Sequence, residues 1–417
     1  MRDKDVGGGM TVDGELRVAH LLSALRPSGA ERMLACSFGL WRLHRIDPVI
    51  IGVGDEPHPF APALRSAGYE TVLVARNSRS PGGLAALRSA LVGLRPDIVH
   101  VHTESMFPLV CALARVTPGV RGVVRSIHNN YAYRGLLAPR RVLFSRAAAA
   151  LGVVSVACGA EVADNEEFRY RHRPRMVENW VDVTAFAAGD LHERASAARE
   201  QLGLTPADFV VMLLGNCEPA KGHALMLDAI AGVRQPLVGL HVGGEERADE
   251  AEQASWQRVA GRHRLIRLGR RDDVPALLAA ADLLAMPSEH EGFPVAAAES
   301  FCAATPVMAS LAPGLRWVTG FRTGRTVPRE VSAWASELER ARERRGSSEW
   351  ARARRQDASD AHRRFAPQRG VAEWRRLYDR AVLGSGPRRR WRPPARQPAP
   401  APPLPVSNNA IAREPLP

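Results

Sequence analysis

Cysteine, lysine and long apolar runs are all scarce in this chain of 417 residues. The cysteines form no C-x-x-C pair, which excludes a zinc ribbon and a disulfide scaffold and is typical of a reducing cytosol. No apolar run reaches transmembrane length, and no apolar signal core lies within the N-terminal stretch MRDKDVGGGMTVDG. We therefore expect a cytoplasmic protein. The five cysteines are Cys36, Cys111, Cys158, Cys217 and Cys302.

Lysine is rarer still, because only Lys4 and Lys221 are lysines among the 57 basic residues. Of the net charge of +13, residues 322–380 contribute +7 (16 Arg, nine acids) and residues 381–417 contribute +5 (six Arg, one acid), so the remainder is almost neutral. We expect no nucleic-acid partner, since the basic stretches hold few aromatics for stacking. Arg alternates with acids over 330–364, which predicts solvated helix faces. Peripheral contact with an anionic membrane is the alternative.

Short apolar runs alternate with helix-like stretches such as 30–43, 84–94, 224–233 and 274–281. Several runs are apolar on both faces, as in a covered parallel sheet, and the alternation favours the α/β class. Two sets of strands flank a polar stretch near 183–205, where we place a domain junction. The predicted strands are 16–22, 49–53, 71–75, 97–101, 123–127, 153–156, 209–214, 237–242, 265–268, 283–286 and 307–309.

The segment GNCEPAKGH, residues 215–223, joins a predicted strand to a predicted helix. A glycine-flanked turn with a cation at a helix start suits a phosphate, because free backbone N–H groups and the helix dipole favour anions. Lys221 is the only lysine of the expected folded body, which strengthens this interpretation, although chance placement is the alternative. The segment does not have the Walker pattern.

Two carboxylates stand eight positions apart in PSEHEGFPVAAAES, residues 287–300. Gly292 allows close backbone approach, and Pro294 can open a helix. Glu291 and Glu299 could then lie on one side of a cleft and bind vicinal hydroxyls. A glycosidase pair is a second interpretation, and a helix cap with a surface glutamate is a third.

A histidine, His128, follows the predicted strand 123–127 in the sequence SIHNN. At a strand end it could hydrogen-bond a substrate, and a purely structural role is equally compatible. His100 and His102 share one side of a strand by their spacing. We do not favour a metal there, because no further ligand cluster accompanies them.

These segments together resemble the retaining glycosyltransferases of family 4, over about residues 16–382. The most specific element is E-x7-E (Glu291 to Glu299), preceded by LGRRDDVPALLAAADLLAMPS and followed by ATPV. GNCEPAKG, the SGAER loop and VENWVD are also similar to family patterns. The resemblance implies the GT-B fold, in which two Rossmann-like α/β domains with parallel sheets face each other across a cleft.

The resemblance also sets the expected domain limits. It implies an N-terminal acceptor-side domain at 15–183, a linker at 184–205 and a nucleotide-sugar domain at 206–365. A C-terminal helix, 366–382, is expected to pack back towards the first domain. Residues 1–14 and the Pro- and Arg-rich tail 383–417, with ten prolines after residue 386, are expected to be disordered.

By resemblance, the catalytic residues are Glu291, Lys221 and His128. Lys221 neutralises the donor diphosphate, His128 contacts the transferred sugar, and Glu299 binds the ribose hydroxyls. Glu291 holds the sugar and its phosphate end together with the backbone that follows it. The donor-binding residues are Glu299, Gly29, Asn216, Gly292, Phe293, Pro294 and Arg270.

The resemblance implies no cofactor and no metal. It also implies that the acceptor attacks on the face from which the leaving group departs, without a carboxylate nucleophile, and this overrides the glycosidase interpretation. The sequence departs from the family at Asn216, where an arginine is usual, and at Ala304, where a glycine is usual. Its oligomeric state is unknown from the sequence.

The implied reaction moves a hexose or N-acetylhexosamine from a nucleotide sugar, with UDP-GlcNAc favoured, to an acceptor hydroxyl. The acceptor is a lipid-linked or polysaccharide glycan at the inner membrane face, or an aminoglycoside-type antibiotic intermediate. An epimerase, a phosphorylase and a non-catalytic homologue are the alternatives.

Overall fold

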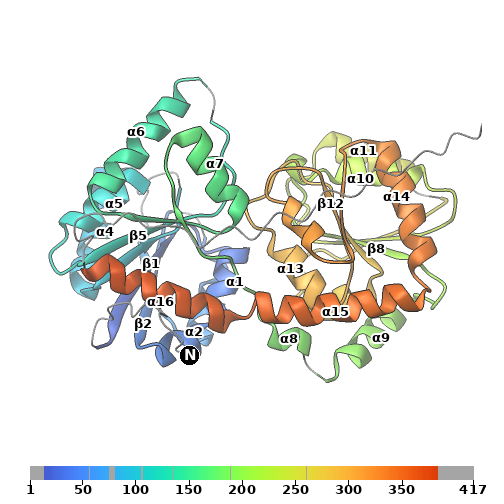
Figure 1. Ribbon diagram of the computed structural model, residues 1–417, viewed down its shortest axis with the longest axis horizontal. Coiled ribbons are helices and arrows are strands. Elements are labelled where there is room, and N and C mark those ends of the chain that lie inside the picture. The colour runs from blue at the N-terminus through green and yellow to red at the C-terminus, as the bar shows by residue number, and fades with distance from the viewer. Residues whose placement is uncertain are drawn as a thin grey trace, which may run out of the picture. The chain divides into compact units, whose positions relative to one another are not determined.

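The computed structural model describes residues 14–55, 57–74, 80–104, 107–133, 135–187, 189–259 and 261–383. The first sheet is parallel, with helices beside it (Figure 1). Its strand order is β3-β2-β1-β4-β5-β6-β7 among the described residues. The strands are β1 (Leu16–Leu22), β2 (Ile46–Val53), β3 (Glu70–Val74), β4 (Ile98–Val101), β5 (Gly122–Ile127), β6 (Val154–Ala157) and β7 (Arg175–Met176).

The second sheet is also parallel, with the order β10-β9-β8-β11-β12-β13 in the described part of the chain. Strands β8 and β11 are almost wholly buried, which explains their continuous apolar sequences VVMLL and LLAM. The predicted α/β class with two parallel sheets is confirmed. The strands are β8 (Val210–Leu214), β9 (Val238–Val242), β10 (Arg264–Arg267), β11 (Leu283–Met286), β12 (Val307–Ser310) and β13 (Gly324–Val327).

The helices of the first half are α1 (Gly29–Ala35), α2 (Phe38–Leu43), α3 (Ala61–Ser66), α4 (Pro81–Leu94), α5 (Phe107–Val116), α6 (Leu137–Ala150) and α7 (Ala160–Tyr170). The single helix predicted over 30–43 is wrong, because α1 and α2 are separate. The Ser37 hydroxyl donates to the carbonyls of Met33 and Leu34 at 2.8 and 3.0 Å and so competes with the helical backbone.

Two helices, α8 (Thr184–Ala187) and α9 (Leu191–Gln201), lie within the segment predicted as a linker. Phe186, Ala195 and Ala198 from them belong to the same apolar cluster as β8 and β11. The second half continues with α10 (His223–Ala231), α11 (Glu250–Val259), α12 (Val274–Ala280), α13 (Val295–Cys302), α14 (Val331–Arg344) and α15 (Ser348–Arg364).

The last described helix, α16 (Pro367–Leu383), packs against the first sheet although it follows the second in sequence. Its Trp374 and Tyr378 belong to the cluster that contains Leu16, and the Tyr378 hydroxyl lies 2.7 Å from His100 Nδ1. The predicted disordered termini fall almost wholly outside the described residues. No helix in the described part of the chain is both long and apolar enough to cross a bilayer.

Candidate functional site

A cleft of about 400 Å³ opens at the carboxyl ends of β8 and β11, where the strand order of the second sheet reverses. Such switch points are where parallel sheets bind ligands. The loop after β1 closes the cleft from the first sheet with Pro27, Ser28, Gly29 and Arg32. The predicted site residues that line it are Gly29, Asn216, Lys221, Arg270, Glu291, Phe293, Pro294 and Glu299.

Lys221 and Glu291 form an ion pair in this cleft. Lys221 ends a 3-10 turn, Pro219–Lys221, and its Nζ lies 2.7 Å from Glu291 Oε1. The Ser288 hydroxyl donates to the same oxygen at 2.8 Å. The main-chain carbonyl of Glu291 accepts from Asn130 Nδ2 at 2.6 Å, which ties this loop to the first sheet. An ammonium has three donors, so Lys221 keeps the capacity to bind an anion in the cleft.

Glu299 lies on α13 and also faces the cleft. Burial raises the pKa of its carboxyl to about 7, and the nearby Arg32 opposes that shift. Within the described part of the chain, no residue gives this carboxylate a hydrogen bond. It therefore offers free acceptor oxygens, which suit the hydroxyls of a ligand.

Two glycines let the two sheets approach each other closely. A Cβ at Gly292 would lie 1.8 Å from the His128 carbonyl oxygen, and a Cβ at Gly29 would lie 2.9 Å from Val295 Cγ2. Phe293 is buried, and its ring stacks on that of Trp317 with the ring centroids 5.0 Å apart, so the Phe293 ring belongs to the core. Only the backbone of this turn is placed to contact a ligand.

Asn216 and Arg270 are exposed and already engaged. Asn216 Oδ1 accepts from the Gly244 N–H at 2.9 Å, and Arg270 Nη2 lies 3.0 Å from Glu246 Oε2. Helix α1 brings a further cation, Arg32, to the cleft opposite Glu299, and no sequence motif predicted it. Arg32 belongs to the SGAER segment, and only the meeting of the two sheets brings its side chain to the cleft.

His128 is placed differently, because it does not line the cleft. It ends a row of histidines: His20 Nδ1 lies 3.1 Å from His102 Nε2, and His102 Nδ1 lies 3.0 Å from His128 Nε2. Burial lowers the pKa of His128 to about 4 and that of His20 to about 3, so both are neutral at pH 7. His128 is therefore a neutral hydrogen-bonding group beside the Gly292 turn.

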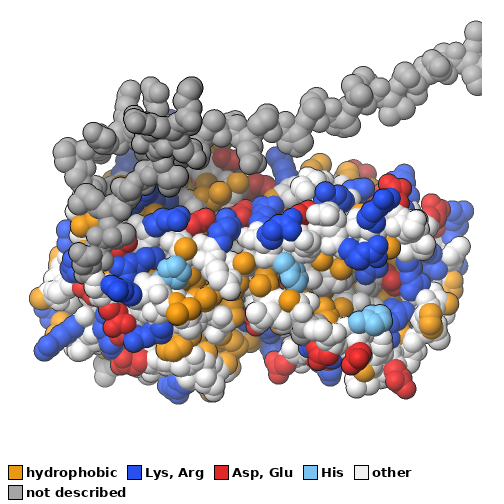
Figure 2. Space-filling view, turned by 60° about the horizontal axis from the view of Figure 1, so that its bottom comes forward, with side chains coloured by type: hydrophobic (Ala, Val, Ile, Leu, Met, Phe, Trp, Pro, Cys, Tyr) orange, Lys and Arg blue, Asp and Glu red, His pale blue; other side chains and the backbone are white. Residues whose placement is uncertain are grey.

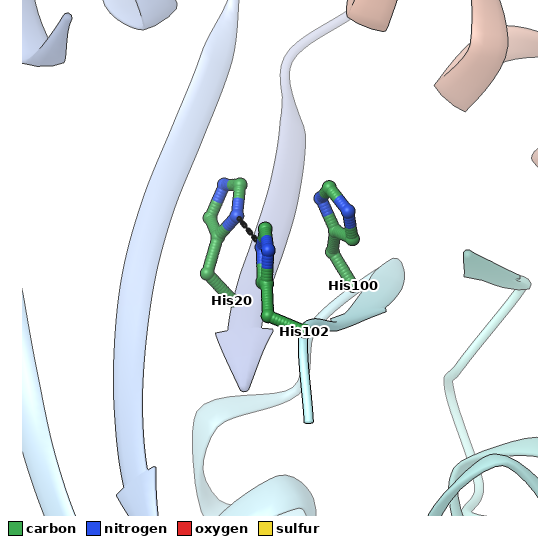
Figure 3. A group of neighbouring side chains, drawn as sticks. All are labelled: His20, His100 and His102. Carbon is green, nitrogen blue, oxygen red and sulfur yellow. Dashed lines mark hydrogen bonds between the residues drawn. The ribbon is translucent and has the colours of Figure 1, made fainter. Parts of the chain in front are cut away.

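The neighbouring His100 is satisfied without any ligand. Its two ring nitrogens lie 2.7 Å from the Tyr378 hydroxyl and 2.8 Å from the Ser126 hydroxyl. Figure 3 shows His20 and His102 pointing towards each other, with His100 to one side. Because protein hydroxyls engage both ring nitrogens of His100, that ring has no nitrogen left for a metal ion.

Comparison with known proteins matches both halves of the chain to glycosyltransferase families. Residues 15–185 match the family described as Glycosyltransferase Family 4, and residues 208–343 match Glycosyl transferases group 1. A D-inositol 3-phosphate glycosyltransferase of Salinispora arenicola is 32% identical over 235 residues, which are 52% of this chain and 51% of that protein. One of Corynebacterium urealyticum is 29% identical over 59% of this chain and 63% of its own length. The match to the Salinispora protein thus spans about half of its length.

Solved structures share the fold at low identity. A glycosyltransferase from Rickettsia africae has a TM-score of 0.75 and 15% identity, covering 89% of this chain and 100% of that one. Anabaena HepE, in complex with UDP and glucose, has a TM-score of 0.67 and 19% identity, covering 86% of this chain and 98% of that one. These likenesses support the expected two-domain architecture.

Proposed function

Since the chain belongs to glycosyltransferase family 4, with the GT-B fold of that family, we propose that it transfers a sugar from a nucleotide sugar to an acceptor hydroxyl. The observation that carries the proposal is the Lys221–Glu291 ion pair beside the free carboxylate of Glu299 in one cleft. Lys221 thus offers a cation for a diphosphate, and Glu299 offers a hydrogen-bond acceptor for ribose hydroxyls, in the same cleft. We favour a UDP-sugar, UDP-GlcNAc first, as the donor.

In this mechanism Lys221 stabilises the charge that develops on the diphosphate as the bond to the sugar breaks. Arg32 supplies the second cation, in place of the arginine that the family usually has at the position of Asn216. Glu299 accepts hydrogen bonds from the ribose. Glu291 is held by Lys221 and Ser288, so it orients the sugar and does not attack it.

The acceptor hydroxyl attacks from the face on which the diphosphate leaves, which retains the configuration at the anomeric carbon. Although His128 does not line the cleft, it adjoins the Gly292 turn, and we propose that its neutral ring hydrogen-bonds the sugar from there. Its low pKa makes it unsuited to serve as a cation at pH 7. The backbone of Gly292, Phe293 and Pro294 borders the sugar, and Arg270 and Gly29 border the base and the phosphates.

The acceptor belongs to one of three hydroxyl-bearing classes. Two classes are those expected from the sequence, a lipid-linked or polysaccharide glycan and an aminoglycoside-type intermediate. The third class is a phosphorylated polyol, suggested by the relatives named D-inositol 3-phosphate glycosyltransferases. All three are tested by one screen. The protein is incubated with UDP-GlcNAc, UDP-glucose and GDP-mannose against each acceptor class, and products are detected by mass.

We expect a product that is heavier by one sugar with at least one donor–acceptor pair. Turnover of the nucleotide sugar without an acceptor alcohol would indicate an epimerase, and release of a sugar phosphate in the presence of inorganic phosphate would indicate a phosphorylase. Absence of both turnover and UDP binding, in protein with a cooperative thermal transition, would leave a non-catalytic homologue and refute the proposal.

A further inference from the structure

A second group of polar side chains lies buried behind the loop that carries Lys221. Cys217 follows β8, His223 begins α10, His241 lies on β9 and Glu252 lies on α11. All four are at most 4% exposed. Cys217, His223 and His241 each offer a ligand atom within 4.8 Å of the others. None of these side chains has a role in the proposed transfer reaction.

Two of the spacings in this cluster match those of ligand pairs around one tetrahedral ion. Cys217 Sγ lies 3.6 Å from His241 Nε2, and His223 Nδ1 lies 3.2 Å from Glu252 Oε1. With Zn–S of about 2.3 Å and Zn–N or Zn–O of about 2.0–2.1 Å, tetrahedral angles give about 3.6 Å for a sulfur–nitrogen pair and about 3.4 Å for a nitrogen–oxygen pair. Both pairs lie within about 0.2 Å of these values.

The charges and the outer contacts of the cluster also suit a divalent cation. A thiolate and a carboxylate together balance the charge of Zn²⁺, which a buried site requires. His241 Nδ1 is buried without a hydrogen-bond partner and lies 3.7 Å from Glu245 Oε1. His241 Nε2 lies 3.0 Å from the Gly215 carbonyl oxygen, and a metal at Nε2 would replace that contact. Coordination would then put the ring proton on Nδ1, facing the Glu245 carboxylate, as in many metal-bound histidines.

We propose that Cys217, His223, His241 and Glu252 form a structural zinc site in the second domain. Zinc fits better than magnesium or calcium, because one ligand is sulfur and two are nitrogen. All four tetrahedral positions are filled by protein, so this ion holds the fold and takes no part in chemistry. Cys217 and His223 bracket Lys221 in the sequence, so the ion fixes both ends of the loop that presents this lysine to the cleft.

The test uses the full chain without an affinity tag, stripped with a chelator and titrated with Co²⁺ as a coloured substitute for Zn²⁺. We expect saturation at one equivalent, visible bands of tetrahedral cobalt, and a near-ultraviolet thiolate-to-cobalt band that Zn²⁺ abolishes. The melting temperature should rise with zinc concentration, because the ion binds the folded state. Folded protein that lacks the thiolate band at equimolar Co²⁺ would overturn the proposal.

Two variants and one control assign the ligands. Cys217→Ser should lose the thiolate band, whereas Cys302→Ser, which alters another buried thiol of the same domain, should keep it. Glu252→Gln should keep the band and weaken zinc binding by at least the roughly 10–100-fold that loss of an outer-shell partner costs, because Glu252 is a direct ligand. A thiolate band that persists in Cys217→Ser would place the metal elsewhere and sink the proposal. If Cys217→Ser does not fold, as judged by its circular dichroism, Glu252→Gln provides the test. A zinc affinity of Glu252→Gln equal to that of the wild type would then refute the proposal.

Discussion

At the scale of the residue, Lys221 is the side chain on which the proposed reaction most depends. Its ammonium lies in the cleft, 2.7 Å from Glu291. Loss of a preorganised donor to developing charge typically lowers kcat on the order of 10²–10³-fold. We expect such a loss in Lys221→Ala, with a partial return in Lys221→Arg, in assays of sugar transfer. Lys4→Ala, which alters the only other lysine, is the control. Transfer and UDP affinity that both equal the wild type would refute the role of Lys221.

Glu299 gives the donor site a pH dependence whose direction follows from its environment. Burial raises the pKa of the carboxyl to about 7, so the carboxylate forms as the pH rises through that value. Hydroxyl groups donate best to the ionised form, and a pKa near 7 changes its population about tenfold between pH 6 and pH 8. Calorimetry should therefore show UDP affinity rising over this range. Glu299→Gln reports the titration of UDP itself, and an identical profile in the two proteins would contradict the prediction.

The same raised pKa affects folding in the opposite direction. The folded state favours the protonated form of Glu299, so its contribution to stability is present at low pH and is lost as the pH rises through about 7. Donor binding and stability thus respond oppositely to the same proton. A site that binds hydroxyls through a buried carboxylate gives up stability for that function.

Ala304 is a residue whose backbone conformation favours glycine. Its φ is +58°, in the left-handed region, which costs about 1–2 kcal/mol for a residue with a Cβ. Ala304→Gly should raise the free energy of unfolding by up to about 1 kcal/mol, because the greater chain entropy of glycine offsets part of the gain. Urea denaturation measures the change. Ala303→Gly, at a φ of −77°, should destabilise the fold; equal effects of the two changes would exclude this explanation.

The spacing of Glu291 and Glu299 predicted that they share one side of a cleft, and the family resemblance added Lys221; all three line the cleft in the structure. Arg32 was missed, because no local pattern reveals which loops of two separate sheets meet. The burial of His128 within a row of histidines was missed for a similar reason, because it depends on which strands are neighbours. His20, His102 and His128 come from three different strands or strand ends, and only the sheet order β1-β4-β5 makes them neighbours.

At the scale of the element, helix α16 is fitted closely to the first sheet. A Cβ at Gly370 would lie 2.1 Å from Trp180 Cε3, and Trp180 is 1% exposed with its Nε1 bonded to the Met33 carbonyl at 3.0 Å. The indole therefore has little room to move. Gly370→Ala should destabilise the protein by about 1–3 kcal/mol despite the better helix propensity of alanine.

Thermal and urea unfolding measure this change. Gly346→Ala, which introduces a Cβ into open space between α14 and α15, is the matched control and should leave the free energy of unfolding almost unchanged. A Gly370→Ala variant as stable as the wild type would mean that α16 does not pack tightly on Trp180.

Apolar runs predicted most strands, including the edge strands β3 and β10, whereas the edge strands β7 and β13 were missed. The eleven predicted strands correspond to β1–β6 and β8–β12. Both residues of β7 and Arg325 of β13 face solvent. Strand β7 is only two residues long, and Val327 is the only large apolar residue of β13, so neither strand forms an apolar run.

At the scale of the whole molecule, the excess positive charge is the feature that bears on location. The face shown in Figure 2 has arginine side chains interspersed with acidic ones. In α14 and α15 several arginines are paired with neighbouring acids, among them Arg340 with Glu337 and Arg363 with Asp360. These pairs do not cancel the excess: by composition, residues 322–380 keep a net charge of +7, and residues 384–417, with six arginines and one acid, add +5.

We therefore expect the full chain to float with vesicles that contain anionic lipid, at low salt, and to be released as salt screens the attraction. A chain that ends at Leu383 keeps every residue of the four apolar clusters and should melt at the same temperature, but should bind anionic vesicles more weakly, because it loses +5 of the net charge. Neutral vesicles are the control. Full-length protein that stays unbound to anionic vesicles would exclude a peripheral membrane role.

The return of α16 to the first sheet has a consequence for biosynthesis. Trp374 and Tyr378 complete the apolar cluster that begins with Leu16, so that cluster gathers residues from near both ends of the described chain. A ribosome delivers all of β8–β13 before it delivers α16, and domains generally fold as they emerge. The second domain can thus fold first, while the first waits, incomplete, for its last helix, and nascent chains that stall before Pro367 should depend on chaperones to stay soluble.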